Sequence, residues 1–198
     1  KTMGWSIDTW SMSEETIDEP TFLDDVTQTV QQYRKMMDGL LAEKDVKLFV
    51  QVYEFTDRVG HVMWRFLDPE HPAYDAEKAA KFAPSVERNY VEMDNIVGDA
   101  LKELGADDLL LVCSDHGFDW YQGAFTHYNR AQEPPSGVLL LAGPGIRKGY
   151  RLQGATLMDI APTILHALGL PTGADMDGQV LERAFEPAWR ERFPVRQV

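Results

Sequence analysis

Apolar residues recur at helical spacing in three stretches of the chain. The first begins at residue 21 or 24 and ends near 43, the second begins at 79 or 84 and ends at 104, and the third covers 156–168. Each stretch gathers its apolar side chains on one face, which predicts an amphipathic helix packed against a core. Gly105 and Gly169 follow the second and third stretches and are typical helix stops.

Short runs of apolar and β-branched residues predict three strands, at residues 47–55, 108–114 and 137–142. Strands that alternate with amphipathic helices are typical of βαβ units, so the pattern predicts an α/β fold with a mainly parallel sheet flanked by helices. Three strands are few for such a sheet, so either the domain is small and decorated or part of the sheet is missing. A length of 198 residues requires only one domain, which we expect to cover 1–198.

A carboxylate and an imidazole follow each of the first two predicted strands. Asp57 and His61 come after the first, and Asp115 and His116 after the second. Ligands of open α/β sheets bind outside the carboxyl ends of the strands, so these side chains are candidates for a shared site. Asp57 and His61 are four residues apart and would share one face if the chain turns helical. His127, in the loop that follows, is close enough along the chain to join them.

Carboxylates and imidazoles together suit borderline divalent ions such as zinc or manganese. The spacing alone leaves a second interpretation open, in which Asp115 caps a helix and His116 packs locally. His71 lies between two prolines and is expected to be exposed or loosely packed, and His166 is expected to be a satisfied or surface residue of the third helix. The single cysteine, Cys113, excludes an intrachain disulfide and is expected to be a buried, inert thiol.

The net charge of −13, from 32 acidic and 19 basic residues, argues against a nucleic-acid partner, because binding a phosphate backbone depends on basic patches. An acidic chain would need metal ions to bind an anionic substrate. No apolar run approaches the ~20 residues that span a bilayer, so no membrane partner is expected for this chain. The sequence does not indicate a cellular compartment.

Several motifs, taken in chain order, resemble the alkaline phosphatase superfamily, and most closely its type I phosphodiesterase and nucleotide pyrophosphatase branch. They lie at residues 57–64 with the loop 68–72, at 114–118 (Ser-Asp-His-Gly-Phe), and at 137–146, 159–165 and 176–178. The resemblance runs from about residue 48 to residue 181. It implies an alkaline phosphatase-like α/β fold and metal-dependent hydrolysis of phosphate esters, phosphodiesters or pyrophosphates.

The resemblance also implies the ligands of two divalent ions, zinc or manganese. Asp57, His61 and His127 would hold one ion, and Asp115 and His116 would contribute to the other. The substrate would be a phosphorylated small molecule. Related branches share this ligand set, so a phosphomutase or a sulfatase is an alternative, and a non-catalytic metal-binding domain is a third.

The chain departs from the family pattern in its first part. Family members carry an early strand that ends in an aspartate ligand, followed by a Thr or Ser nucleophile, and we find neither, so we assign no catalytic residue here. The chain is therefore expected to be a C-terminal portion with an apparently partial fold, and the missing N-terminal half of the same protein would be its partner. Alone, it is expected to bind at most one ion well and to be close to inactive.

Overall fold

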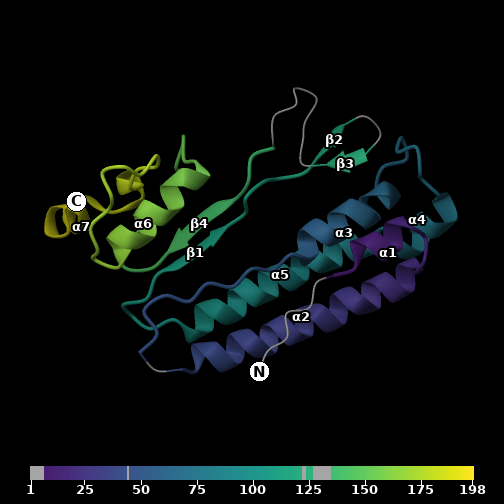
Figure 1. Ribbon diagram of the computed structural model, residues 1–198, viewed down its shortest axis with the longest axis horizontal. Helices are drawn as coiled ribbons and strands as arrows, with labels where there is room; N and C mark the ends of the chain where they lie inside the picture. Colours follow the sequence, from purple (N-terminus) through teal and green to yellow (C-terminus); the bar gives the residue numbers. More distant parts are fainter. Residues whose placement is uncertain (1–6, 44, 122–123, 127–134) are drawn as a thin grey trace. The chain divides into compact units, whose positions relative to one another are not determined.

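The computed structural model of the chain describes residues 7–43, 45–121, 124–126 and 135–198 (Figure 1). It divides into two compact units. The first unit combines Lys1–Glu103 with His116–Ser136, and the second combines Leu104–Asp115 with Gly137–Val198. Each unit is described by itself below.

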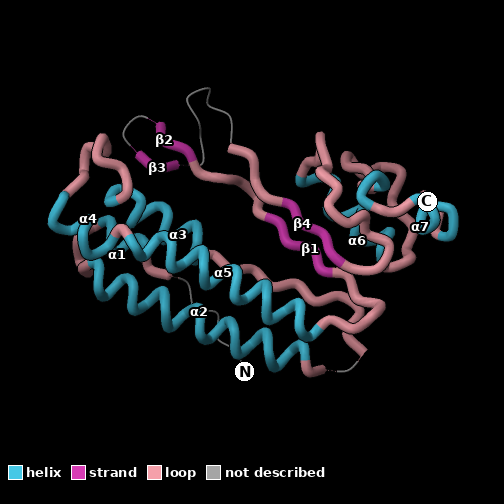
Figure 2. Tube along the Cα trace, turned by 180° about the vertical axis from the view of Figure 1, so that it is seen from behind, coloured by secondary structure: helices cyan, strands magenta, loops and turns pink. Residues whose placement is uncertain are grey.

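The first unit is mainly helical. Its elements are α1 (Thr9–Ser13), α2 (Glu19–Leu41), α3 (Phe55–Met63), the 3-10 turn η1 (Trp64–Phe66), α4 (Ala76–Phe82), α5 (Pro84–Glu103) and the antiparallel pair β2 (Asp119–Tyr121) and β3 (Ala124–Thr126). Figure 2 shows α2 and α5 running alongside each other. Arg34 of α2 joins them through ion pairs with Asp99 and, at 2.8 Å, with Glu92. The two long predicted helices are therefore confirmed, and they bury the chain's larger apolar core.

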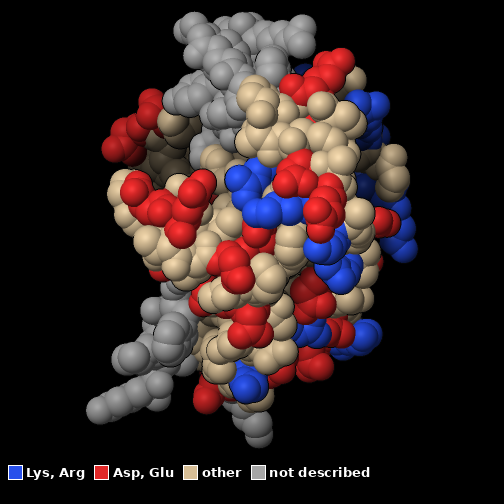
Figure 3. All heavy atoms as spheres, turned by 90° about the vertical axis from the view of Figure 1, so that its right-hand side faces the viewer, with Lys and Arg blue, Asp and Glu red and all other residues tan. Residues whose placement is uncertain are grey.

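A buried carboxylate fixes the beginning of α2. The side chain of Glu19 is 5% exposed, and its Oε1 lies 2.7 Å from Nζ of Lys78 and 3.1 Å from Nη2 of Arg65. Burial acts to raise the pKa of Glu19, but the hydrogen bond from Lys78 and the two positive charges lower it below the usual value. The trio thus ties α2 to α4 and η1. On the face shown in Figure 3, basic side chains lie among acidic ones.

The second unit holds a two-stranded sheet and short helices. Its elements are β1 (Leu110–Cys113), β4 (Leu139–Ala142), η2 (Leu157–Asp159), α6 (Ile160–Ala167), η3 (Glu182–Ala184) and α7 (Pro187–Arg192). The strands β1 and β4 pair antiparallel, with Leu110 opposite Ala142 and Cys113 opposite Leu139. A capping box between Thr156 and Asp159 begins the η2–α6 helix, which confirms the third predicted helix. The small core of the second unit consists of Ile146, Ala184 and Phe185.

The mainly parallel sheet is not confirmed, because both strand pairs in the described residues are antiparallel. The predicted strand at 47–55 is wrong. Residues 46–54 are irregular, and in the described part of the chain no strand pairs with them. Leu48, Val50 and Val52 are 52%, 70% and 66% exposed, while Phe49 and Tyr53 pack against the core. The alternating pattern thus marks a half-buried extended segment, since a strand also needs a hydrogen-bonded neighbour.

Two further predictions about single side chains are wrong. Cys113 is exposed, because it ends a strand whose sheet has only two members. His166 is buried against Phe185, with ring centroids 5.3 Å apart, and its Nε2 has no hydrogen-bond partner among the described residues. Of the helices that the structure describes, none combines the length and apolar character needed to cross a membrane.

Candidate metal-binding site

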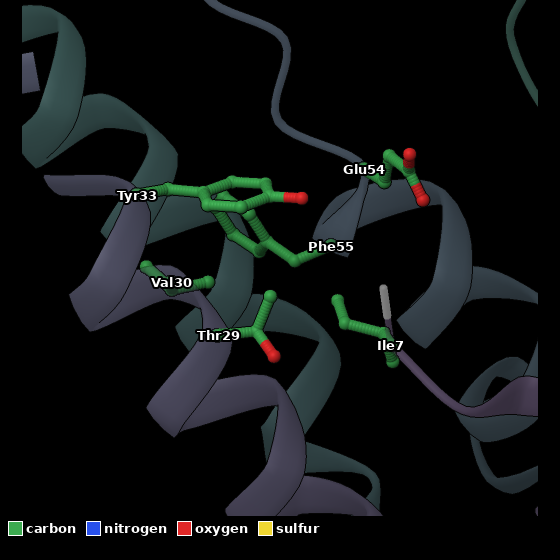
Figure 4. A pocket seen from close by; sticks show the side chains of 6 residues that line it. All are labelled: Ile7, Thr29, Val30, Tyr33, Glu54 and Phe55. Carbon is green, nitrogen blue, oxygen red and sulfur yellow. The ribbon is translucent and has the colours of Figure 1, made fainter. Parts of the chain in front are cut away.

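The beginning of α3 is anchored in the core of the first unit. Phe55, the first residue of α3, is fully buried and reaches toward Tyr33 and Val30 of α2 beside a narrow pocket (Figure 4). Tyr53 lies edge-on to both aromatic rings, with centroids 6.1 Å from Phe55 and 6.0 Å from Tyr33. This packing fixes the first turn of α3, the turn that carries Asp57.

Asp57 and His61 lie on one face of α3, as their spacing predicts for a helix. Asp57 stands in the first turn, where the positive end of the helix dipole favours a carboxylate. Its Oδ1 lies 3.5 Å from Nε2 of His61 and 3.7 Å from Nε2 of His116. These separations exceed the ~2.9 Å of a direct hydrogen bond, so the three atoms face one another without closing a direct contact. One carboxylate oxygen and two imidazole nitrogens therefore converge.

The other oxygen of the same carboxylate faces a cation. Oδ2 of Asp57 lies 3.7 Å from Nε of Arg58, and the Arg58 guanidinium in turn contacts Oε2 of Glu54 at 3.2 and 3.3 Å. Arg58 is about one-third exposed, so these charges interact partly through solvent. The arrangement nonetheless separates the two oxygens of Asp57, with Oδ1 toward the imidazoles and Oδ2 toward Arg58.

A backbone contact orients the His116 ring. Its Nδ1 lies 3.0 Å from the carbonyl oxygen of Gly117. With the proton on Nδ1, this nitrogen donates to the carbonyl, and Nε2 keeps a lone pair directed toward Asp57. Metal-binding histidines are commonly held in this way, through the ring nitrogen that does not bind the ion.

Phe118 lies against both imidazoles. Its ring centroid is 5.0 Å from that of His61 and 5.8 Å from that of His116, with interplanar angles of 73° and 72°. A Cβ placed on Gly60 would lie 3.1 Å from Cζ of Phe118, so the glycine leaves the space that the ring fills. Sequence reasoning assigned no role to either residue. The available signal was a glycine inside the helical Asp-Arg-Val-Gly-His stretch and an aromatic residue directly after Asp-His-Gly.

Of the five predicted ligands, the structure brings together Asp57, His61 and His116. Asp115 is exposed and belongs to the second unit, and His127 lies outside the described residues. Within the described part of the chain, no group of three or more His, Cys, Asp and Glu side chains is close enough to hold a metal ion as it stands. The chemistry of the three converging atoms still fits a divalent ion, because imidazole nitrogen and carboxylate oxygen are common zinc ligands.

The histidines that were not predicted to be ligands lie elsewhere. Nδ1 of His71 accepts a hydrogen bond of 3.0 Å from the backbone N–H of Ala73 in the proline-bounded loop, and partial burial lowers the pKa of His71. His166 lies in the second unit. Neither imidazole is among the three groups that converge on Asp57.

The sequence of the chain matches a known protein family and a protein of known name. Residues 2–132, which include α3 and His116, match the sequence model of the family described as type I phosphodiesterase / nucleotide pyrophosphatase. A 2,3-bisphosphoglycerate-independent phosphoglycerate mutase of Bacteroides thetaiotaomicron is 26% identical over 150 residues. That match covers 71% of this chain and 29% of the mutase, so the chain spans less than a third of its relative. No solved structure matches the chain.

Proposed function

The chain belongs to the type I phosphodiesterase / nucleotide pyrophosphatase family, and from that premise we propose that it is part of a metal-dependent phosphoryl-transfer enzyme. The reaction we assign to the whole protein is hydrolysis of a phosphate ester, a phosphodiester or a pyrophosphate. Its substrate is a phosphorylated small molecule. The nucleophile and the remaining metal ligands come from the part of the protein that this chain does not include.

One observation carries the proposal. Oδ1 of Asp57 faces Nε2 of both His61 and His116 inside the segment that matches the family. Asp57 and His61, with His127, are assigned to one divalent ion, and His116 with Asp115 to the second. We propose zinc or manganese as the ion, because both accept mixed imidazole and carboxylate ligands. Zinc is the first choice.

When bound, paired divalent ions supply charge that polarises a phosphoryl group, activates the nucleophile and stabilises the leaving oxygen. The contacts of the residues in this chain support the proposal. Asp57 directs one oxygen toward the imidazoles, and Arg58 holds the other. The Gly117 carbonyl orients His116. Phe118 packs against His61 on the face of α3 that carries the candidate ligands.

A second function is favoured by the comparison with the mutase. The relative is named a phosphoglycerate mutase, and a mutase returns the phosphoryl group to a substrate hydroxyl where a hydrolase gives it to water. Both reactions can use the same metal ligands, so the ligand geometry does not separate them. An assay of the whole protein does, with a phosphodiester substrate in one sample and 3-phosphoglycerate in another.

The first test is the metal content of the purified chain. We expect about one zinc or manganese per chain, retained after dialysis, and loss of that metal in Asp57→Ala. His71→Ala is the matched control, since His71 lies in a loop with its own backbone partner, and it should keep the metal. An equal metal content in wild type, Asp57→Ala and His71→Ala would contradict the proposed site.

Activity is tested on the whole protein and on the 198-residue chain in parallel. We expect turnover of bis-p-nitrophenyl phosphate by the whole protein, its loss in Asp57→Ala, and little or none with the chain alone. Conversion of 3-phosphoglycerate without phosphodiester turnover would assign the mutase reaction instead. No turnover of either substrate by a metal-loaded whole protein would favour a metal-binding domain without catalysis.

A further inference from the structure

We propose that Phe118 is a positioning residue that sets the orientation of His61 and His116, and that Gly60 is required because it gives the Phe118 ring its place. The inference rests on the proposed function, since it assigns these residues a task in building the metal site. Phe118 itself offers no ligand atom. Its effect is exerted through the two imidazoles.

Gly60 leaves space beside α3 for the ring of Phe118. The glycine lies in the middle of α3, where alanine is ordinarily the better helix former. A Cβ here would lie 3.1, 3.3 and 3.4 Å from three ring atoms of Phe118. The two shorter contacts are tighter than nearly all real Cβ contacts, so alanine requires the ring to shift by a few tenths of an ångström. Gly98 of α5 provides the contrast, because a Cβ there meets no atom within 4 Å.

Phe118 contacts both imidazoles. His61 is on the turn of α3 next to Gly60, and His116 is two residues before Phe118, so the ring joins a helix to a separate segment of the first unit. Both ring pairs are close to perpendicular, at 73° and 72°, which is a preferred arrangement of aromatic rings. A single side chain thus limits the rotation of two candidate ligands.

The backbone next to Phe118 is held in place by residues 135–136. The N–H of Gly117 donates a 2.9 Å hydrogen bond to the carbonyl of Pro135, and a Cβ on Gly117 would lie 2.7 Å from the carbonyl oxygen of Ser136. The chain between His116 and Phe118 is therefore held against residues 135–136. Because its backbone is fixed, Phe118 can act as a support for the imidazoles.

The orientation of the imidazoles is tested by NMR of the histidine rings in the metal-free chain. Phe118→Leu keeps an apolar side chain but removes a ring current, which shifts nearby protons whatever their orientation, so the readout is the set of nuclear Overhauser contacts of the imidazole protons. We expect these contacts to change for His61 and His116 and to stay the same for His71 and His166. Phe82→Leu, which alters the Phe66–Phe82 ring pair of the same unit, is the control and should leave His61 and His116 unchanged.

The consequence is tested by the affinity of the chain for zinc, measured by competition with a chromophoric chelator. Residues that orient metal ligands commonly change affinity by about 10- to 100-fold. We expect Gly60→Ala and Phe118→Leu each to weaken zinc binding by about 10-fold. Gly98→Ala, the same substitution at an open helix position, should not change it. Gly60→Ala should cost less when Leu already replaces Phe118, because the clash is then relieved.

The outcomes separate this inference from the proposed function. Zinc binding that depends on Asp57 but is equal in wild type, Gly60→Ala and Phe118→Leu would overturn the role of Phe118 and leave the metal site standing. If the wild-type chain does not bind zinc, the proposed site fails. The nuclear Overhauser contacts of the imidazoles then decide the role of Phe118, which is supported if Phe118→Leu changes those of both His61 and His116 and overturned if it changes neither.

Discussion

The two units of the chain differ in how much apolar surface they bury. Among the residues that the structure describes, fourteen buried apolar residues form the core of the first unit, against three in the second. Of the four buried side-chain nitrogens without a partner among the described residues, three belong to the second unit: His166 Nε2, Trp189 Nε1 and Arg190 Nε. Buried apolar area is the main stabilising contribution to a fold, and unpaired buried polar atoms oppose it. The candidate metal ligands Asp57, His61 and His116 therefore lie on the better-supported unit.

The largest expected effect comes from removing the centre of the small core. Phe185 is fully buried in the second unit, and Phe185→Ala should cost about 3–5 kcal/mol. With only Ile146 and Ala184 left in its core cluster, the second unit should unfold while the first stays folded. Hydrogen exchange read by mass spectrometry would show lost protection in 137–198 and retained protection in α2 and α5.

Phe22→Ala is the matched control, because Phe22 is equally buried in the first core. It should lower protection of α2 and α5. If either variant lowers protection equally in both units, the units unfold as one, and the contrast between them does not hold.

A smaller effect is expected from the buried carboxylate of the first unit. Glu19→Gln removes the charge that faces Arg65 and Lys78, and we expect a loss of about 1–3 kcal/mol, less than for a fully buried pair because both cations are partly exposed. The pKa of Glu19 is lowered in the folded chain, so its contribution is present above the usual value of 4.5 and is lost as the pH falls through the folded pKa.

Urea unfolding at pH 7 and at pH 3 measures this contribution. The difference between wild type and Glu19→Gln should be clear at pH 7 and should shrink at pH 3. Glu77→Gln, on an exposed pair with Lys81, is the control and should change little at either pH. A Glu19→Gln variant as stable as wild type at pH 7 would mean that the ion pairs do not secure α2.

The smallest effect concerns His166 in the second unit. Burial lowers the pKa of His166 below its usual 6.5, and the nearby Glu182 only partly offsets this. The unfolded chain therefore binds the proton more readily. Above pH 6.5, protonation of His166 should not reduce the free energy of unfolding of the second unit. Below pH 6.5 this free energy should fall, by at most about 1.4 kcal/mol per pH unit, until the pH passes the pKa of His166 in the folded chain.

Hydrogen exchange of α6 between pH 7.5 and 5, corrected for the intrinsic rate, measures this slope. His166→Leu should flatten it, and His71→Leu, in the first unit, should leave it unchanged. A slope that persists in His166→Leu would assign the pH dependence to another group.

The helices were predictable from sequence because each depends on its own periodicity. The apolar spacing that begins at residue 21 or 24 corresponds to α2, and Gly105 follows the end of α5 closely. The segment 46–54 was not predictable in the same way, since alternation describes which side chains are buried and not whether a neighbouring strand supplies hydrogen bonds. Cys113 was expected to be buried for a related reason, since an apolar run does not indicate how many strands its sheet contains.

At the candidate site, the sequence predicts that Asp57, His61 and His116 lie close together, but it does not predict which side chains support them. His116 does approach Asp57 as predicted, although the strand expected to lead to Asp57 is an irregular segment. The placement of Phe118 against Gly60 could not, because nothing in the spacing indicates which side chain fills the gap left by a glycine. The predictions for Asp115 and His127 as ligands stay predictions.

The exposed stripe of Leu48, Val50 and Val52 has a consequence for handling the protein. An exposed apolar segment that pairs with no strand in the described part of the chain is the kind of surface through which chains associate into β-structure. The net charge of −13 opposes this by keeping like-charged molecules apart, and that repulsion weakens as salt shortens its range to about 8 Å at 0.15 M. The solubility of the isolated chain therefore depends on the exposed apolar segment, which favours association, and on the net charge, which opposes it. Higher ionic strength should lower the solubility.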